Sequence, residues 1–294
     1  MRYDLHIHTA ASDGSDSPDS LARKVVGAGL ELFSVTDHDT VDGALAMEGL
    51  IPAGVGYIRG VEFSCVSPGG KCHILGYGFD PEHPAFRAAL GEGAQLRQEK
   101  LENRIVHLRE KFGIRLTAGE EQWLRSLKSP GKPHLGRLLV QRGLADELSA
   151  AIKTYLSGVP GRDRIDSKTA IDAILAAGGI PVWAHPLGGE GEKRLTRAEF
   201  EHRLAVLMAE GIRGLECCYS RYDMDESELL LRCARERGLI ATGGSDYHGS
   251  NKKGIELGQL GTVPANWSID TTPFSGIILQ KKADRSTGGV SIEQ

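Results

Sequence analysis

The sequence predicts an α/β fold in which a mainly parallel sheet is interrupted by a block of helices. Short apolar strands alternate with helices up to about residue 84 and again from about residue 164, which is typical of parallel strands joined by crossover helices. Residues 85–163 show helical periodicity without a convincing strand. We therefore predict a barrel-like domain from residues 1–84 and 164–270, a helical insertion at 85–163 that acts as a substrate lid, and a disordered tail at 271–294.

In the first half of the barrel, each strand is expected to end in a polar loop. Residues 3–8 alternate as a strand does, and a Gly/Ser/Pro-rich loop leads to a helix that starts at Pro18 and ends at Gly29. Further strands are expected at 32–36, 55–65 and 71–77, with a short helix at 41–48. Loops at the carboxyl ends of strands assemble the site in such folds, so we expect Asp13 and His38 to lie in it.

The same periodicities predict the helices and strands of the insertion and of the second half of the barrel. Helical periodicity runs through residues 86–127 with a break at Gly113, and further helices are expected at 135–142 and 148–156. The alternation then resumes, with helices at 170–177, 200–210 and 227–237 and strands at 180–184, 214–218 and 239–242. The last strand leads into Asp246 and His248, which places two more polar side chains at a strand end.

The composition is that of an ordinary globular protein and excludes several functional classes. A net charge of −4 gives no general basic surface for nucleic acid, although a local site for a phosphate or a short oligonucleotide is compatible with it. No signal peptide is visible, and no apolar run approaches the roughly 20 residues of a membrane span. The five cysteines lack C-x-x-C spacing and are expected to be reduced. We expect a cytoplasmic protein without membrane contact or a stable protein partner.

Histidines and carboxylates gather at the expected strand ends. His6 and His8 lie two residues apart on a strand and therefore point to the same face, and Asp246 and His248 repeat that spacing on the last strand. In a closed barrel the first and last strands are neighbours, so the two pairs could meet. The candidate metal ligands are His6, His8, Asp13, His38, Glu62, His73, His185, Asp246 and His248. Such a set without thiolates suits two or three divalent ions, Mn²⁺ first, with Fe²⁺ or Zn²⁺ as alternatives.

The insertion carries basic side chains along one face of a helix. Arg97, Lys100 and Arg104 are spaced by three and four residues and so share that face. They form either a solvated face interleaved with glutamates or a basic surface over an anionic substrate. His134 opens a later helix, and helix N-termini favour anions. A phosphate contact and a plain helix-entry role are both open for this histidine.

Taken together, the motifs resemble the full series of the PHP (polymerase and histidinol phosphatase) metallo-phosphoesterases. The matching motifs are His6-x-His8-Thr9, Ser12-Asp13-Gly14, Thr36-Asp37-His38-Asp39, Gly60-Val61-Glu62-Phe63-Ser64, His73-Ile74-Leu75-Gly76-Tyr77, Ala184-His185-Pro186 and Gly244-Ser245-Asp246-Tyr247-His248-Gly249. The resemblance implies a distorted (β/α)₇ barrel, the PHP fold, with a trinuclear metal centre. It assigns His6, His8, Glu62 and Asp246 to one ion, Asp13, His38 and His248 to a second, and a bridging Glu62 with His73 and His185 to a third.

Within that family, the insertion and the Lys132-Pro133-His134 motif most resemble the branch of nucleoside 3′,5′-bisphosphate phosphatases and small exoribonucleases. The resemblance implies hydrolysis of a phosphate ester of a small nucleotide-like substrate to a nucleoside 5′-monophosphate and phosphate, by attack of a metal-bridging hydroxide. The expected catalytic residues are His185, which is also a candidate proton donor, Asp246 and His248. The expected substrate-binding residues are Arg97, Lys100 (where the branch commonly has Arg), Arg104 and His134. Asp37 and Asp39 are expected to orient His38.

Several other functions keep the same ligand set. A cyclic-phosphate diester hydrolase, a histidinol-phosphate phosphatase and a 5′-3′ exoribonuclease acting on short RNA are alternatives that differ only in substrate. A non-catalytic metal-binding interaction module is a remote alternative, disfavoured because no metal position is missing. A metal-dependent amidohydrolase is disfavoured because no lysine stands out as the carboxylated ligand that some of those enzymes use.

Overall fold

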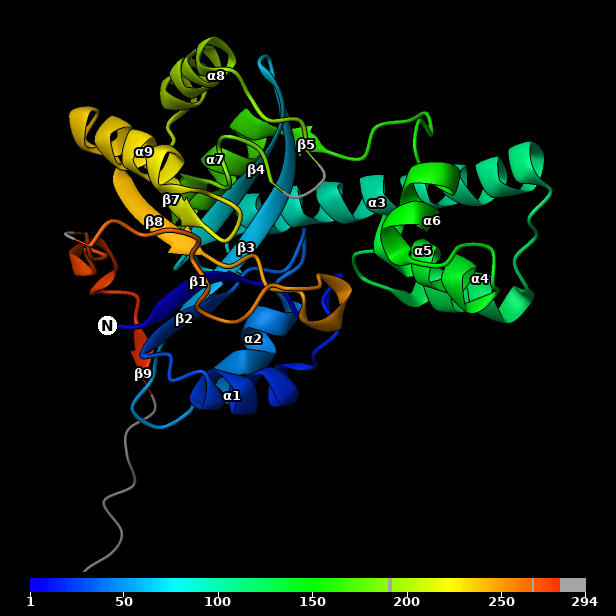
Figure 1. Ribbon diagram of the computed structural model, residues 1–294, viewed down its shortest axis with the longest axis horizontal. Coiled ribbons are helices and arrows are strands. Elements are labelled where there is room, and N and C mark those ends of the chain that lie inside the picture. The colour runs from blue at the N-terminus through cyan, green and yellow to red at the C-terminus, as the bar shows by residue number, and fades with distance from the viewer. Residues whose placement is uncertain (190–191, 266, 281–294) are drawn as a thin grey trace, which may run out of the picture.

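The computed structural model describes residues 1–189, 192–265 and 267–280, and within these the chain forms a barrel-like sheet flanked by helices (Figure 1). The sheet order is β1-β2-β3-β4-β6-β7-β8, with β5 and β9 pairing with β3 outside this path. The strands are β1 (Tyr3–Ile7), β2 (Leu32–Val35), β3 (Gly56–Ser67), β4 (Gly70–Tyr77), β5 (Ile165–Asp166), β6 (Ile180–Trp183), β7 (Gly214–Tyr219), β8 (Ile240–Gly244) and β9 (Leu279–Gln280). The predicted distorted seven-stranded barrel is confirmed.

The barrel closes where the chain after β8 meets β1. The Asp246 N–H donates to His6 O at 2.9 Å, and the His8 N–H donates to Tyr247 O at 2.8 Å. Ile7 and Tyr247 form a parallel bridge. The expected proximity of the first and last strands is therefore confirmed, and backbone hydrogen bonds hold the two ends of the candidate ligand set in register.

One strand runs against the others. β4 is antiparallel to both β3 and β6, whereas the remaining neighbours along the main path are parallel. Only Pro68 and Gly69 lie between β3 and β4, and so short a connection allows a hairpin but no crossover helix. The sequence analysis expected two successive strands here without a helix between them, and the structure pairs them as an antiparallel hairpin within the mainly parallel sheet.

In the described part of the chain, five α-helices cover the barrel and four form the block between β4 and β5. The first group is α1 (Pro18–Gly27), α2 (Asp42–Glu48), α7 (Ser167–Ala176), α8 (Arg197–Glu210) and α9 (Met224–Glu236) among the described residues. The second is α3 (Pro84–Phe112), α4 (Ala118–Ser126), α5 (Lys132–Gln141) and α6 (Leu148–Tyr155). The predicted break at Gly113 is confirmed: this glycine ends α3 in a left-handed conformation with φ 66°.

Helix α3 runs from the barrel to the α4–α6 block (Figure 1), and its two halves belong to different hydrophobic cores. Its first half contributes Phe86 and Ala89 to the large core that also contains the barrel residues Phe63 and Trp183. Its second half contributes Leu101, among others, to a separate core with α4, α5 and α6. Since burial of apolar surface is the main stabilising force, α3 ties the α4–α6 block to the barrel through these two cores.

The ordered chain extends beyond residue 270, where a disordered tail was predicted to begin. Phe274 lies in a short 3₁₀ helix and is fully buried against Tyr77, and β9 then pairs with the start of β3. The prediction is therefore wrong for residues 271–280, because apolar side chains there complete a core. Residues 281–294 lie outside the described part of the chain. Among the described helices, none has the length and apolar character needed to cross a membrane.

Candidate metal centre

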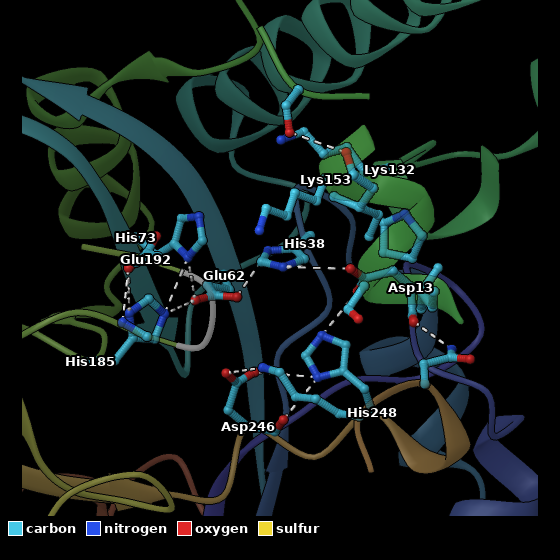
Figure 2. Close-up of a pocket in the computed structure, with 18 residues that line it drawn as sticks. Asp13, His38, Glu62, His73, Lys132, Lys153, His185, Glu192, Asp246 and His248 are labelled. Carbon is cyan, nitrogen blue, oxygen red and sulfur yellow. Dashed lines mark hydrogen bonds and ion pairs between the residues drawn. The ribbon is translucent and has the colours of Figure 1, made fainter. Parts of the chain in front are cut away.

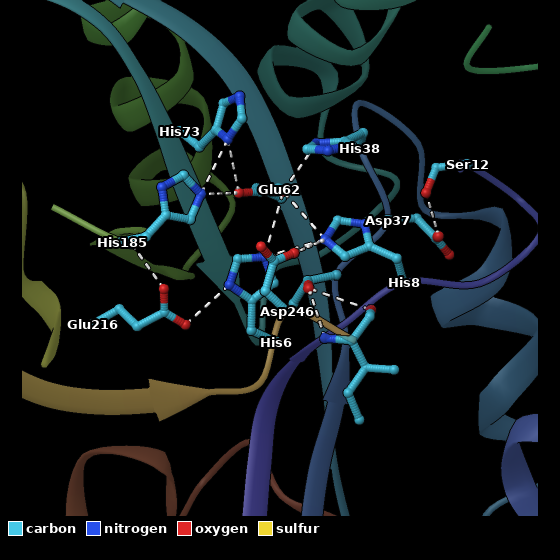
Figure 3. A network of polar contacts seen from close by, with 12 residues as sticks. His6, His8, Ser12, Asp37, His38, Glu62, His73, His185, Glu216 and Asp246 are labelled. Carbon is cyan, nitrogen blue, oxygen red and sulfur yellow. Dashed lines mark hydrogen bonds and ion pairs between the residues drawn. The ribbon is translucent and has the colours of Figure 1, made fainter. Parts of the chain in front are cut away.

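The nine candidate ligands converge at the carboxyl end of the barrel. Seven of them line a cavity of about 610 Å³: Asp13, His38, Glu62, His73, His185, Asp246 and His248 (Figure 2). His6 and His8 are fully buried beneath them (Figure 3). They come from β1, β3 and β4 and from the loops that follow β1, β2, β6 and β8, so the closed sheet brings together residues far apart in the chain.

A first cluster consists of His6, His8, Glu62 and Asp246. His6 Nε2 lies 3.1 Å from His8 Nε2, and these two nitrogens lie 3.4 Å and 3.3 Å from Glu62 Oε2. Asp246 Oδ1 lies 3.7 Å from His6 Nε2 and 3.4 Å from His8 Nε2. Bonds of about 2.1 Å to one ion place its ligand atoms at comparable separations. The four side chains therefore fit a single divalent ion.

A second cluster surrounds Asp13. Its Oδ1 lies 3.2 Å from His248 Nε2, and its Oδ2 lies 4.0 Å from His38 Nε2. His8 stacks on His248 with ring centroids 4.0 Å apart and belongs to the same group of possible ligands. The His248 Nδ1 atom lies 2.8 Å from the Asp246 carbonyl oxygen, so its proton goes there and the Nε2 lone pair faces Asp13.

A third cluster uses the other oxygen of Glu62. Glu62 Oε1 lies 3.1 Å from His73 Nδ1 and 3.2 Å from His185 Nε2, and these nitrogens are 3.2 Å apart. Glu62 Oε2 lies 2.9 Å from His38 Nδ1, but both atoms are buried without a hydrogen-bond partner among the described residues. One bound cation would satisfy both of these buried atoms. Glu62 therefore fits a bridging position.

The pKa values of Glu62 and His73 favour the protonation states that bind cations. Burial raises the pKa of Glu62, but electrostatic interactions with neighbouring histidines, His38 first, outweigh burial and hold that pKa well below its usual range. Glu62 is thus ionised at neutral pH. Burial is the largest influence on His73 and lowers its pKa to about 4, so its imidazole is neutral and has a free lone pair.

Glu216 is a component of the site that the sequence prediction missed. It is fully buried; its Oε1 lies 2.9 Å from His6 Nδ1, and its Oε2 accepts the His185 backbone N–H at 2.7 Å (Figure 3). A carboxylate on Nδ1 fixes the tautomer whose Nε2 lone pair points into the first cluster. The sequence signal was a lone acidic residue inside the apolar run Gly-Leu-Glu-Cys-Cys of a buried strand.

Glu192 was also missed. Its Oε2 lies 3.4 Å from His185 Nδ1 and accepts the Gly189 N–H at 3.0 Å. It lines the cavity, and with His73 and His185 it forms another group whose atoms could hold a metal. Its position in a polar loop between β6 and α8 gave no signal in the sequence.

Strained backbone marks two of the candidate ligands. His185 and Asp246 have φ angles of 29° and 57°, and with Asp39 at 49° they are the described non-glycine residues with positive φ. This conformation disfavours residues with a Cβ atom, and it persists where surrounding contacts hold it. Here it directs both side chains into the cavity.

The predicted role of Asp37 and Asp39 in orienting His38 is wrong. Asp37 accepts hydrogen bonds from the Thr9 N–H, the Thr9 hydroxyl and the Ser12 hydroxyl at 2.6–2.7 Å. It therefore fixes the loop that carries Asp13. Asp39 accepts the Ser64 N–H at 2.9 Å and pairs with Arg97.

The basic residues predicted to bind substrate make other contacts. Arg97 bonds to Asp39 and to the Ser64 hydroxyl, at 2.5 Å and 2.8 Å. Lys100 Nζ donates to the carbonyls of Val159 and Gly161, each at 2.8 Å. These partners hold Arg97 beside β3 and attach α3 to the chain that leads into β5.

The other two predicted substrate-binding residues are also engaged. Arg104 faces Asp163 at 3.4 Å, and the Nδ1 atom of His134 accepts the Gly131 N–H at 3.0 Å. Arg97, Lys100, Arg104 and His134 do not line the described cavity, where Lys132 and Lys153 lie instead (Figure 2). Helical periodicity correctly placed three of the residues on one face, but that face packs against protein.

Comparisons with known proteins give a consistent result. No family model matches the chain. The chain is 34% identical over 252 residues to a 5′-3′ exoribonuclease of Haemophilus influenzae, covering 84% of this chain and 90% of the relative. It is 29% identical to a 3′,5′-nucleoside bisphosphate phosphatase of Chromobacterium violaceum, covering 89% and 92%.

Two solved structures share the fold. A Chromobacterium violaceum protein described as an amidohydrolase with bound sulfate superposes with a TM-score of 0.81 at 27% identity, covering 95% of this chain and 98% of that one. A Bifidobacterium adolescentis protein described as a candidate metal-dependent phosphoesterase gives 0.76 at 25% identity, covering 88% and 92%. With its barrel, its clustered donors and its identity to a curated relative over most of its length, this chain belongs to the PHP family of metal-dependent phosphoesterases.

Proposed function

We propose that this phosphoesterase hydrolyses the 3′-phosphate ester of a nucleoside 3′,5′-bisphosphate. The observation that carries the proposal is Glu62, whose two carboxylate oxygens face different histidine clusters on the floor of one cavity. A phosphoryl group needs several positive charges at short range, and clusters that share a carboxylate meet this need. A nucleotide substrate is supported by two similar proteins, one named as a nucleoside bisphosphate phosphatase and one as an exoribonuclease.

We assign the ions to the three clusters described above, with Mn²⁺ as the first candidate and Fe²⁺ or Zn²⁺ as alternatives. The donors are imidazole and carboxylate groups, which all three ions accept. When bound, such ions supply a nucleophile at neutral pH and neutralise charge on the phosphoryl oxygens.

His185 and His248 hold ions in this proposal, and neither serves as the proton donor. His185 Nε2 faces Glu62 Oε1, and its Nδ1 faces Glu192. His248 directs Nδ1 to a backbone carbonyl and Nε2 to Asp13. Each imidazole therefore has both nitrogens engaged. Asp246 takes part through its Oδ1 atom in the first cluster, while its Oδ2 accepts the Tyr219 hydroxyl at 2.9 Å.

The second phosphate of the substrate is assigned to the wall formed by α5 and α6. Lys132 at the start of α5 and Lys153 on α6 line the cavity beside the apolar side chains of Leu148 and Ile152. Ammonium groups provide charge for a phosphate, and an apolar surface suits the nucleoside.

A substrate panel tests the proposal. The Mn²⁺-loaded protein should release phosphate from adenosine 3′,5′-bisphosphate with a kcat/KM at least tenfold above that for adenosine 3′-monophosphate, because the second phosphate gains charge-assisted contacts. Histidinol phosphate and a 2′,3′-cyclic phosphate complete the panel. Treatment with a chelator should abolish turnover, and added metal should restore it. Equal turnover of mono- and bisphosphates would contradict the assignment, and a preference for another panel member would replace it.

Metal binding should release protons from the histidines. Burial lowers the pKa of His8, but hydrogen bonding with Asp246 and Glu62 outweighs it and raises the pKa to about 9. Since this value exceeds the ordinary 6.5, the stability that His8 adds to the metal-stripped protein is complete below pH 6.5 and is lost as the pH rises through 9. Between these values His8 must lose a proton to bind metal.

Apparent metal affinity should therefore rise with pH, by roughly tenfold per unit for each proton released. Titration calorimetry at pH 7, in buffers of different ionisation enthalpy, should show at least one proton released as metal binds. A proton count of zero, with affinity independent of pH from 6.5 to 9, would contradict the ligand role of His8.

A further inference from the structure

A second cavity, of about 410 Å³, adjoins the candidate metal centre. It shares His73 and His185 with the first cavity, so the two spaces meet at the third cluster. The remainder of its wall comes mainly from β4, the segment before β5, the loop after β6 and helix α8. Of the described residues on α5 and α6, the lining includes Lys132 alone. The second cavity thus extends from the third cluster towards β4 and α8, whereas α5 and α6 flank the first.

Two cations continue outward from the third cluster. Lys71 and His73 lie two residues apart on β4, so their side chains project from the same face of the strand, about 7 Å apart along it. Arg164 lies beside this pair, because its Nη1 donates to the carbonyl oxygen of the intervening Cys72 at 3.2 Å. Burial is the main influence that lowers the pKa of His73, and the charge of Arg164 lowers it further. Lys71 and Arg164 therefore place positive charge beside a candidate metal ligand.

Neither cation is neutralised by the protein. Within the described chain, the Lys71 ammonium group has no hydrogen bond or ion pair, and Arg164 has no ion pair. The Nε atom of Arg164 is buried without a hydrogen-bond partner among the described residues. An unpartnered buried N–H is costly unless a ligand accepts it. The two side chains are therefore available to bind an anion.

The acids in the wall are engaged with other groups. Among the described residues, two glutamates line the second cavity, against five lysines and arginines. Glu199 accepts a hydrogen bond from Lys193 at 2.8 Å and belongs to the capping box of α8. Glu192 accepts the Gly189 N–H at 3.0 Å and faces His185 Nδ1 at 3.4 Å. The second cavity therefore keeps an excess of positive charge beside the third cluster.

The backbone that carries Lys71 is anchored. Arg203 on α8 donates through Nε and Nη2 to Gly69 O, at 3.1 Å and 2.6 Å, and through Nη1 to Lys71 O at 2.5 Å. These bonds fix the turn between β3 and β4. A backbone that is already held reduces the conformational entropy lost when the ammonium group binds an anion.

The proposed reaction produces an anion next to this cavity. Water oxygen forms a bond to phosphorus, the P–O3′ bond breaks, and the leaving O3′ takes up a proton. The products are a nucleoside 5′-monophosphate and inorganic phosphate. Because the nucleotide is assigned to the α5–α6 side of the first cavity, the inorganic phosphate forms on the side of the metal clusters. A bound nucleotide then separates it from the α5–α6 side, and the second cavity offers another way out.

We propose that the second cavity is a binding site for inorganic phosphate, through which this product leaves the metal centre. Lys71 and Arg164 are its anion-binding groups, while Lys132 stays with the second phosphate of the substrate. The exit role rests on the proposed function, since that reaction supplies the phosphate. The binding site itself depends on the cations of the second cavity.

Product inhibition tests the exit role. Inorganic phosphate added to the Mn²⁺-loaded protein should raise KM for adenosine 3′,5′-bisphosphate by competing at the metal centre. It should also lower kcat, because phosphate in the second cavity delays product release while substrate occupies the first. In Lys71→Ala the inhibition constant for the effect on kcat should rise about tenfold, the effect of one charge-assisted phosphate contact, and that for the effect on KM should stay within about twofold. Lys71→Arg should restore most of the loss.

A binding measurement tests the site without turnover. Titration calorimetry of the full chain, stripped of metal by a chelator, should show binding of inorganic phosphate that Lys71→Ala weakens about tenfold. Lys71 is exposed, so its replacement leaves the core intact. Lys168→Ala, which removes an exposed lysine of α7 outside both cavities, is the matched control in both experiments.

The two experiments separate the possible failures. The inference is overturned if the stripped protein binds no phosphate, or if Lys71→Ala binds it as tightly as wild type does. Inhibition that raises KM and leaves kcat unchanged overturns the exit role, and the proposed function stands. If the bisphosphate is not hydrolysed with metal present, the proposed function fails, and the phosphate titration alone decides whether the second cavity is an anion site.

Discussion

Replacing Glu62 with glutamine should lower kcat/KM for the phosphoester substrate on the order of 10³-fold or more. Both oxygens of this carboxylate face histidine nitrogens at 2.9–3.4 Å, so its charge is shared by more than one cluster. The amide keeps the shape of the side chain but lacks the negative charge and places an NH₂ group against a cation. Losing the charge stabilisation that bound ions provide raises the free energy of the transition state by several kcal/mol.

The metal content of the Glu62→Gln protein should fall together with its activity. We expect mass spectrometry of the purified protein to show loss of more than one ion per chain, since the residue touches more than one cluster. Glu99→Gln is the matched control: this glutamate lies on α3, where it accepts a hydrogen bond from Gln95, away from the cavity. A Glu62→Gln protein with wild-type metal content and turnover would exclude the bridging role.

Replacing Glu216 with alanine should weaken metal binding by about 10- to 100-fold and destabilise the fold. The substitution leaves the His6 Nδ1 atom and the His185 N–H without their acceptor in a fully buried position. Removing one partner from a buried charged network costs about 3 kcal/mol, which lowers the melting temperature by roughly 10 °C in a chain of this size. The loss in affinity follows because His6 is no longer held in the tautomer and orientation that the first cluster requires.

Two further variants separate these effects. Glu216→Gln retains one acceptor oxygen and should lie between alanine and wild type in both metal affinity and melting temperature. Cys217→Ala removes a neighbouring buried side chain from the same strand and should leave metal affinity unchanged. Metal titration and thermal unfolding with and without metal measure both quantities. If Glu216→Ala binds metal as tightly as wild type, the carboxylate has only a structural role.

The sequence by itself determined much of the barrel and the composition of the candidate site. The two-residue spacing of His6 and His8 is meaningful because alternate side chains of a strand share a face, and the structure places both nitrogens 3.1 Å apart. The break at Gly113 followed from the local conformational freedom of glycine. The ordered series of motifs is specific enough to indicate the family from the sequence. All of these are local properties of a few consecutive residues.

Only the tertiary structure decided which residues orient the candidate metal ligands and which basic residues pack against protein. The basic face of Arg97, Lys100 and Arg104 follows from helical spacing, but what that face meets depends on the segment around residues 159–163. Glu216 looked like one acidic residue in an apolar strand, and its role depends on His6, 210 positions earlier in the chain.

A cavity of about 410 Å³ next to the metal centre, lined in part by Lys71, Arg164 and Arg203, illustrates the same limit. Lys71 on β4, Arg164 before β5 and Arg203 on α8 share one wall only because β4 reverses direction and α8 packs beside its hairpin. Local patterns report which face a side chain takes, since backbone geometry fixes it within a few residues. Charge networks and cavities arise from contacts between distant segments, and closure of the barrel is what brings those segments together.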